Sequence, residues 1–244
     1  MDDKYVERTY RNQLKNERLV YFNVTVKQTD LWIGAGKNLY DHALKSILKC
    51  RSIIEAYALK YPEFITSFSP VKAAPNAPLI IRKMCSAAFS ADVGPMASVA
   101  GAISESVGLD LMKYTDEVIV ENGGDIYVNC KNDIKTGIFA GESPFSDKFA
   151  ITIKSTDMPM GICTSSGTIG PSVSFGKSDA VVILSKSTYL ADAAATSVAN
   201  RVASVNDIEK AIEYAKTIKG VAGVVVVCGN KIGAWGKVEL APWN

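Results

Sequence analysis

Histidine is the scarcest catalytic residue type in this sequence, because His42 is the only one among 244 residues. A Ser-His-Asp triad or a Cys-His pair would have to be built on it. His42 falls in a predicted helix, where a single histidine is most often a surface residue. The sequence therefore gives little support to nucleophilic catalysis of these two types.

Paired cysteines are missing as well. The five cysteines are scattered along the chain without a Cys-x-x-Cys spacing: Cys50, Cys85, Cys130, Cys163 and Cys228. This odd, unpaired set argues against a disulfide framework and a zinc site, and it indicates a reducing compartment. Cys163 precedes a polar loop, and we expect an inert buried thiol there rather than a nucleophile.

Neither sign of charge dominates, since 27 basic and 25 acidic residues leave a net charge of +2. Proteins that bind nucleic acid usually carry a basic stripe, which this sequence lacks. The charged N-terminal residues do not resemble a signal peptide, and no apolar run is long enough to cross a membrane. We expect a cytoplasmic globular protein that binds neither nucleic acid nor a membrane.

The order of the predicted elements indicates an α+β fold, because strands gather in antiparallel groups separated by long helices. Strands are expected at Leu19 to Val26, Thr29 to Ile33, Glu117 to Glu121, Ile126 to Cys130, Ile134 to Ala140, Phe149 to Ile153 and Ala180 to Leu184. Helices are expected at Asn38 to Tyr61, Leu79 to Phe89, Pro95 to Gly108, Ser187 to Asn200 and Asn206 to Ile218. Three short strands between Val221 and Leu240 should form a closing meander.

A single domain of residues 1–244 is the simplest organisation for a chain of this length. Residues 67–78 contain three prolines and an asparagine, which predicts a loop and makes this segment the best candidate for a subdomain boundary.

The chain is organised around the stretch from Cys163 to Asn200, which is a polar loop, a buried strand and an alanine-rich helix. The loop is not a P-loop, because five residues separate Gly170 from Gly176 and a strand rather than a helix follows. Its backbone N–H groups and hydroxyls are nevertheless suited to an anion such as a phosphate.

Asp192 and Thr196 lie four residues apart on that helix and share one face. A carboxylate and a hydroxyl suit a hard cation such as magnesium. The alternative is that Asp192, in an early turn of its helix, only compensates the dipole of that helix. Gly123 and Gly124 likewise have two interpretations, either a tight hairpin turn or a place where a ligand meets bare backbone beside Asp125.

Four short motifs resemble those of the ApbE superfamily, whose characterised members are magnesium-dependent FAD:protein FMN transferases. These are Val93-Gly-Pro-Met-Ala97, Gly123-Gly-Asp-Ile126, Ser165-Ser-Gly167 and Ala191-Asp-Ala-Ala-Ala-Thr196, in the family's order. Almost the whole chain is similar to an uncharacterised branch of that superfamily. We associate that branch by genome context with sulfur assimilation in anaerobic archaea and bacteria.

The resemblance implies a T-fold-like α+β arrangement of two similar halves. It also implies that Asp192 and Thr196 hold magnesium. The residues implied to contact FAD or a related nucleotide are Gly94, Met96, Gly123, Gly124, Asp125, Thr164, Ser165, Ser166 and Gly167.

The sequence departs from the flavin transferases at two points. Their histidine-containing segment after the Thr-Ser-Gly loop has no counterpart between Thr168 and Ser178, and the lysine of their Gly-x-Ile-Ala helix is Ser98 here. Two functions therefore stay open. One is a magnesium-dependent protein for a flavin or another nucleotide, with transferase activity. The other is a non-catalytic accessory in sulfur assimilation that docks onto an iron–sulfur partner. A homodimer is one of the open oligomeric states.

The cysteine pattern yields a direct prediction. Thiol titration of unfolded, unreduced protein should count five free thiols, because no pair is expected to form a disulfide. A count of three or one would contradict the expected reducing compartment.

Overall fold

The computed structural model describes residues 18–167 and 176–243. Its centre is an eight-stranded sheet in the order β1-β2-β3-β4-β7-β8-β9-β10, in which every neighbouring pair is antiparallel. The strands are β1 (Val20–Val26), β2 (Thr29–Ala35), β3 (Val118–Asn122), β4 (Asp125–Asn129), β7 (Met160–Ser165), β8 (Ala180–Ser185), β9 (Val221–Cys228) and β10 (Lys231–Gly236).

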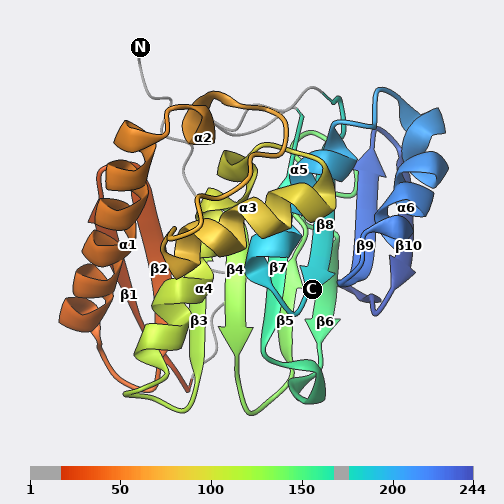
Figure 1. Cartoon of the computed structure of the whole chain (residues 1–244). Coiled ribbons are helices and arrows are strands. Elements are labelled where there is room, and N and C mark those ends of the chain that lie inside the picture. The colour runs from red at the N-terminus through yellow and green to blue at the C-terminus, as the bar shows by residue number, and fades with distance from the viewer. Residues whose placement is uncertain (1–17, 168–175, 244) are drawn as a thin grey trace.

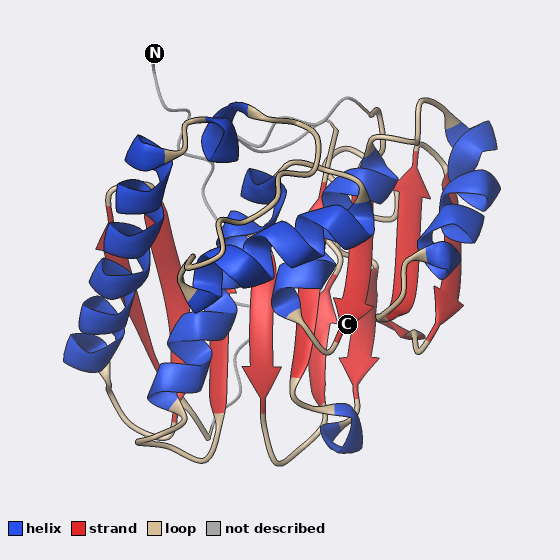
Figure 2. Ribbon diagram, in the orientation of Figure 1, coloured by secondary structure: helices blue, strands red, loops and turns tan. Residues whose placement is uncertain are grey.

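The helices cover one face of this sheet (Figures 1 and 2). They are α1 (Tyr40–Lys60), α2 (Glu63–Thr66), α3 (Leu79–Ala91), α4 (Val99–Leu111), α5 (Thr188–Ala199) and α6 (Ile208–Thr217). Short 3-10 helices are η2 (Pro95–Ser98), η3 (Ser155–Asp157) and η4 (Val205–Asp207). No helix of the described residues is both long and apolar enough to span a membrane.

A second sheet packs behind the first one and has the order β11-β6-β5. Its strands are β5 (Ile134–Gly137), β6 (Phe149–Ile153) and β11 (Glu239–Pro242). The core is accordingly divided. Val118 and Val120 face the helix layer, whereas Ile119 between them joins the cluster that includes Ile151 and Ile153. This alternation along β3 explains why the strand is apolar on both faces.

The fold class predicted from the sequence is confirmed. The large sheet consists of two similar halves, because in each half a hairpin, then helices, then a second hairpin follow along the chain. The first half ends at β4, the second begins at β7, and these two strands are neighbours in the sheet. The segment 67–78 is a loop between α2 and α3, and a subdomain boundary there stays a prediction.

Three sequence-based boundaries are wrong. Residues Met160–Ser165 form the central strand β7 instead of opening a polar loop, because small residues there pair with β4 and β8 on both sides. The predicted closing meander is only a hairpin, since β11 leaves β10 and pairs with β6. Gly108 does not end its helix, which continues to Leu111.

Gly108 is instead a packing glycine. A Cβ atom at this position would lie 2.2 Å from the ring of Tyr127. The expected start of that helix at Pro95 is a 3-10 turn, with the α-helix proper beginning at Val99. Among the described residues, all five cysteines are free and buried, as their spacing predicts.

Two helices approach closely at Gly101 on α4, where a Cβ would lie 2.4 Å from the carbonyl oxygen of Thr188 on α5. Gly101→Ala should therefore destabilise the protein by roughly 1–3 kcal/mol through overpacking. Alanine's higher helix propensity, worth about 1 kcal/mol, opposes this loss only in part. Urea denaturation measures the difference.

Ser86→Ala is the matched control, because it raises helix propensity at an exposed position of α3 without adding an atom to the interior. Its free energy of unfolding should stay within about 0.5 kcal/mol of the wild type. Equal stability of Gly101→Ala and wild type would contradict the close α4–α5 contact.

Candidate functional site

The turn between β3 and β4 is a tight hairpin, because Asn122 pairs directly with Asp125 across Gly123 and Gly124. Both glycines have positive φ, +67° and +104° respectively, as the predicted primed turn requires. A Cβ at Gly124 would meet no atom closer than 3.9 Å. Open space therefore lies beside this glycine, so the structure accommodates both interpretations of the turn.

β7 brings the Thr-Ser segment next to the glycine turn. Asp125 on β4 is paired with Cys163 on β7, and Thr164 and Ser165 follow at the end of that strand. Ser166 and Gly167 leave the sheet at the same end, where the Gly167 N–H donates to the carbonyl oxygen of Ser178 at 2.9 Å. Two segments some forty residues apart in sequence thus converge at one end of the sheet.

The alanine-rich helix α5 packs across this region and carries Asp192 and Thr196, both of which are partly accessible. Asp192 Oδ2 accepts a hydrogen bond of 2.8 Å from the backbone N–H of Gly101, in the first turn of α4. The carboxylate therefore stabilises the N-terminus of α4, whereas the structural alternative considered from the sequence concerned the dipole of its own helix.

Two carboxyl groups face each other between β4 and α5. Burial raises the pKa of Asp192 to about 7, and the N–H groups of Gly101 and Ala100 oppose that rise only in part. Burial also raises the pKa of Asp125 well above its usual value, and the nearby charge of Asp192 adds to the effect. The Asp125 side chain is 7% exposed, and its Oδ1 atom has no hydrogen-bond partner among the residues that the structure describes.

An unpartnered buried carboxyl oxygen beside a second carboxyl group is an unfavourable arrangement for the protein alone. A bound cation would favour the charged form of both groups. The candidate donors are oxygen atoms, which hard cations prefer. No group of three or more His, Cys, Asp or Glu residues that could enclose a metal exists among the described residues. Magnesium fits such a sparse set, since it commonly uses one or two carboxylates together with water and substrate phosphates.

Gly94 and Met96 have weaker claims to ligand contact. A Cβ at Gly94 would lie 1.8 Å from the carbonyl oxygen of Ser67, so the loop before α3 packs directly on this glycine. Met96 is partly buried against the helix-side core. Close packing is thus sufficient to explain the glycine, and ligand contact at both positions stays a prediction.

Three polar residues that sequence reasoning did not assign to the site support it. Glu121 is fully buried and accepts a 2.9 Å hydrogen bond from the Gly124 N–H, which holds the turn. Asn122 donates to the carbonyl oxygen of Ala100 at 3.1 Å and ties the turn to α4. Glu105 accepts from the Thr188 N–H at 2.7 Å and pairs with Lys83, which fixes the start of α5. The acidic and amide residues directly before Gly123 were the available signal.

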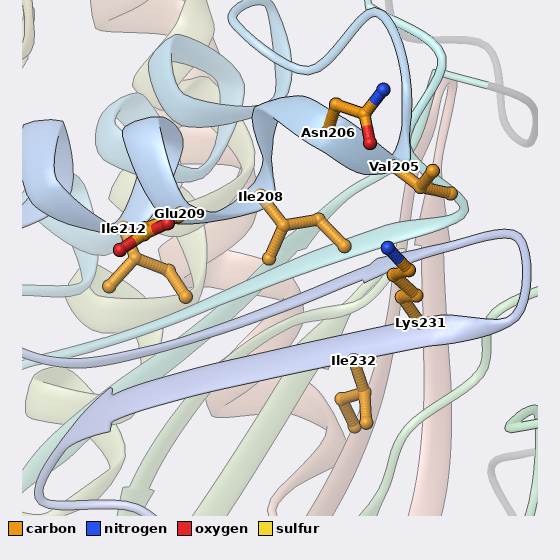
Figure 3. Close-up of a pocket in the computed structure, with 7 residues that line it drawn as sticks. All are labelled: Val205, Asn206, Ile208, Glu209, Ile212, Lys231 and Ile232. Carbon is orange, nitrogen blue, oxygen red and sulfur yellow. The ribbon is translucent and has the colours of Figure 1, made fainter.

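A groove of about 380 Å³ lies between α6 and β10 (Figure 3), away from these residues, and none of the predicted site residues lines it. His42 is not among the residues of the candidate site. It is exposed on α1, and its ring centroid lies 4.0 Å from that of Tyr114.

Comparison with known proteins decides the family. The model of the family described as "AbpE bacteria" matches residues 11–240. The chain belongs to this family. A UPF0280 protein from Methanococcus aeolicus is 40% identical over 226 residues, covering 90% of this chain and 91% of the relative. One from Methanocaldococcus jannaschii is 40% identical over 221 residues, covering 88% and 90% respectively.

Solved structures of flavin transferases share the fold of this "AbpE bacteria" family member. A mutant of the flavin transferase ApbE from Vibrio cholerae superposes with a TM-score of 0.59 at 12% identity, covering 89% of this chain and 97% of that one. The ApbE protein from Thermotoga maritima gives 0.55 at 12% identity, covering 88% and 96%. At this identity the likeness establishes the fold.

The raised pKa of Asp192 makes a pH prediction with a definite sign. Its folded-state pKa of about 7 exceeds the usual 3.8, so the folded state binds the proton more tightly and wild-type stability falls as pH rises between these values. Asp192→Asn removes the charge and can keep the bond to Gly101. In metal-free buffer the variant should therefore gain stability over the wild type as pH rises from about 4 to 7, and it should melt higher at pH 8.

Asp207→Asn is the control, because hydrogen bonds from Ser204 lower the pKa of Asp207 and its charged form stabilises the protein. This variant should melt lower than wild type at pH 8. A lower melting temperature of Asp192→Asn at pH 8 would mean that capping of α4 outweighs the cost of the buried charge.

Proposed function

We propose that the protein binds a flavin dinucleotide, or a related nucleotide, together with a divalent cation where the glycine turn, the end of β7 and α5 converge. The observation that carries this proposal is the pair Asp125 and Asp192, with a buried Asp125 oxygen that no described group of the protein satisfies. A cation resolves that deficit, and a nucleotide pyrophosphate supplies the remaining oxygen ligands.

Each segment has a distinct role in this proposal. Asp192 and Thr196 hold the cation, magnesium being the first candidate. Ser165, Ser166 and Gly167 provide hydroxyl and N–H donors for phosphate oxygens, as anion-binding loops do. Gly123 and Gly124 present bare backbone, which lets a flat ring or a sugar approach closely.

A transferase reaction is the chemistry that this arrangement supports best. A bound cation polarises a phosphoryl oxygen when it is present. The protein's own contribution is to position the pyrophosphate and to exclude water. The residues assembled here include no histidine or lysine that could move a proton, which separates this site from that of a transferase with a histidine segment.

The second candidate function is a non-catalytic accessory role in sulfur assimilation, in which the same cleft holds a ligand or docks an iron–sulfur partner. It is favoured by that missing histidine segment and by Ser98, which is fully buried and donates to the Pro95 carbonyl oxygen at 2.8 Å. Ligand binding is expected in both cases, whereas turnover of FAD to a protein-linked flavin is expected only in the first.

Joint binding is the decisive prediction. FAD and magnesium together should raise the melting temperature by roughly 5–10 °C when the ligand concentration is about 100 times its dissociation constant. Bound ligand then adds about 2.7 kcal/mol to the free energy of unfolding, and each kcal/mol raises the melting temperature by about 2–4 °C. FAD without magnesium, or magnesium alone, should give a much smaller shift, since the cation screens the pyrophosphate. Differential scanning fluorimetry measures all combinations.

Controls identify which part of the ligand is recognised. FMN and riboflavin lack the pyrophosphate, ATP lacks the flavin ring, and Asp192→Asn should lose the joint shift. An ATP shift equal to that of FAD would replace the flavin assignment by a general nucleotide site. The absence of any shift at millimolar ligand would refute ligand binding while leaving the fold unaffected.

A further inference from the structure

The strand β10 forms one edge of the large sheet, and it lacks the usual protection of an edge strand. It pairs with β9 alone, over six consecutive residue pairs without a bulge. Natural edges are commonly blocked by prolines, bulges or inward-pointing charges. β10 has the sequence Lys-Ile-Gly-Ala-Trp-Gly, with one charge at its start and no proline. Lys231, Ala234, Trp235 and Gly236 are exposed.

The free hydrogen-bonding groups of this edge can be assigned. A two-residue loop joins β9 to β10, so the flanking pair Cys228 and Lys231 is hydrogen-bonded and the pairs alternate from there. Gly233 and Trp235 therefore bond to β9. The backbone N–H and C=O groups of Ile232 and Ala234 point outward, away from the sheet, where a further strand could pair with them.

The face of β10 toward α6 has a groove at one end and an exposed aromatic side chain at the other, so its two ends are complementary in shape. Gly233 points toward α6, because a Cβ there would lie 2.7 Å from Ile208. Lys231 and Trp235 share that face by the period of two. At the Lys231 end lies the groove of about 380 Å³, lined by Ile208 and Ile212 of α6 and by polar residues of η4 and α6, whereas the Ile232 side chain points to the other face of β10 (Figure 3). At the other end Trp235 is 37% exposed, with Lys216 Nζ 5.7 Å from its ring centroid.

We infer that a second copy of this chain pairs with β10, in antiparallel orientation about a two-fold axis near Gly233. This operation keeps both α6 helices on the same side and continues the sheet from one copy into the other. It places Trp235 of each copy opposite Lys231 of the other, at the mouth of the isoleucine-lined groove. Tryptophan in an apolar recess is a typical anchor of protein interfaces, and a two-fold axis uses each end of the strand twice.

Charge on α6 supports the same partner. α6 runs along β10 in the same direction, with Glu209 near the Lys231 end and Lys216 near the Trp235 end. The two-fold axis therefore brings Glu209 of one copy toward Lys216 of the other. The opposite edge, β1, is different, because Asn23 and Thr25 there donate to Asp30 and form a polar surface.

Sedimentation equilibrium of the full chain tests this interface. The wild type should be a dimer at micromolar concentration. Ala234→Pro should make it monomeric, since proline removes an outward N–H without breaking a bond to β9. Ala234→Lys and Trp235→Ser should each raise the dissociation constant about tenfold or more. These two variants keep the test valid if the proline variant fails to fold.

Val20→Lys is the matched control, because Val20 is an exposed residue of the opposite edge strand. It should leave the dimer intact. A monomeric wild type would overturn the inference. So would a dimer that tolerates all three β10 variants, or one that only Val20→Lys disrupts, because its interface would then lie elsewhere.

Discussion

The backbone contact between α4 and α5 is the constraint on which the site depends. Thr188 lies between two glycines, since a Cβ at Gly101 of α4 or at Gly161 of β7 would come within 2.5 Å of its backbone. Any larger residue at either position would push α5 away from the sheet. The hydrogen bond from Gly101 to Asp192 uses the same contact. Close packing therefore determines where the carboxylate of α5 lies.

This packing has an electrostatic consequence. Because α5 lies so near the sheet, Asp192 is brought beside Asp125, and burial raises the pKa of each carboxyl group. Native proteins rarely keep such a pair without a compensating role. Cys163 is fully buried next to Asp125, and burial together with both carboxyl groups raises the pKa of its thiol, so it is inert at neutral pH.

The two similar halves of the fold place these features at different locations. The candidate site lies at the seam, because the glycine turn and α4 come from the first half whereas β7 and α5 come from the second. Neither half contains the site alone. The proposed dimer contact lies at the outer edge of the second half, on β10. A dimer formed there would leave the seam accessible to ligand, so the two proposals are independent.

Local chemistry in the sequence was sufficient for several parts of this structure. The α+β class followed from alternating and helical patterns, and the Gly123–Gly124 turn followed from the need for positive φ at both residues. Free, buried cysteines followed from their spacing. Local patterns were misleading where tertiary contacts compensate for polarity, as in Met160–Ser165, where Ser165 is buried and Thr164 half-buried in a strand with neighbours on both sides. They were also misleading at Gly108, which packs against Tyr127 rather than ending a helix.

Spacing placed Asp192 and Thr196 on one helix face, but only tertiary packing decided that Asp192 bonds to α4 and lies near Asp125. Residues distant in sequence come into contact only when the helix layer packs on the sheet. No local pattern in the sequence encodes the distance in space between them.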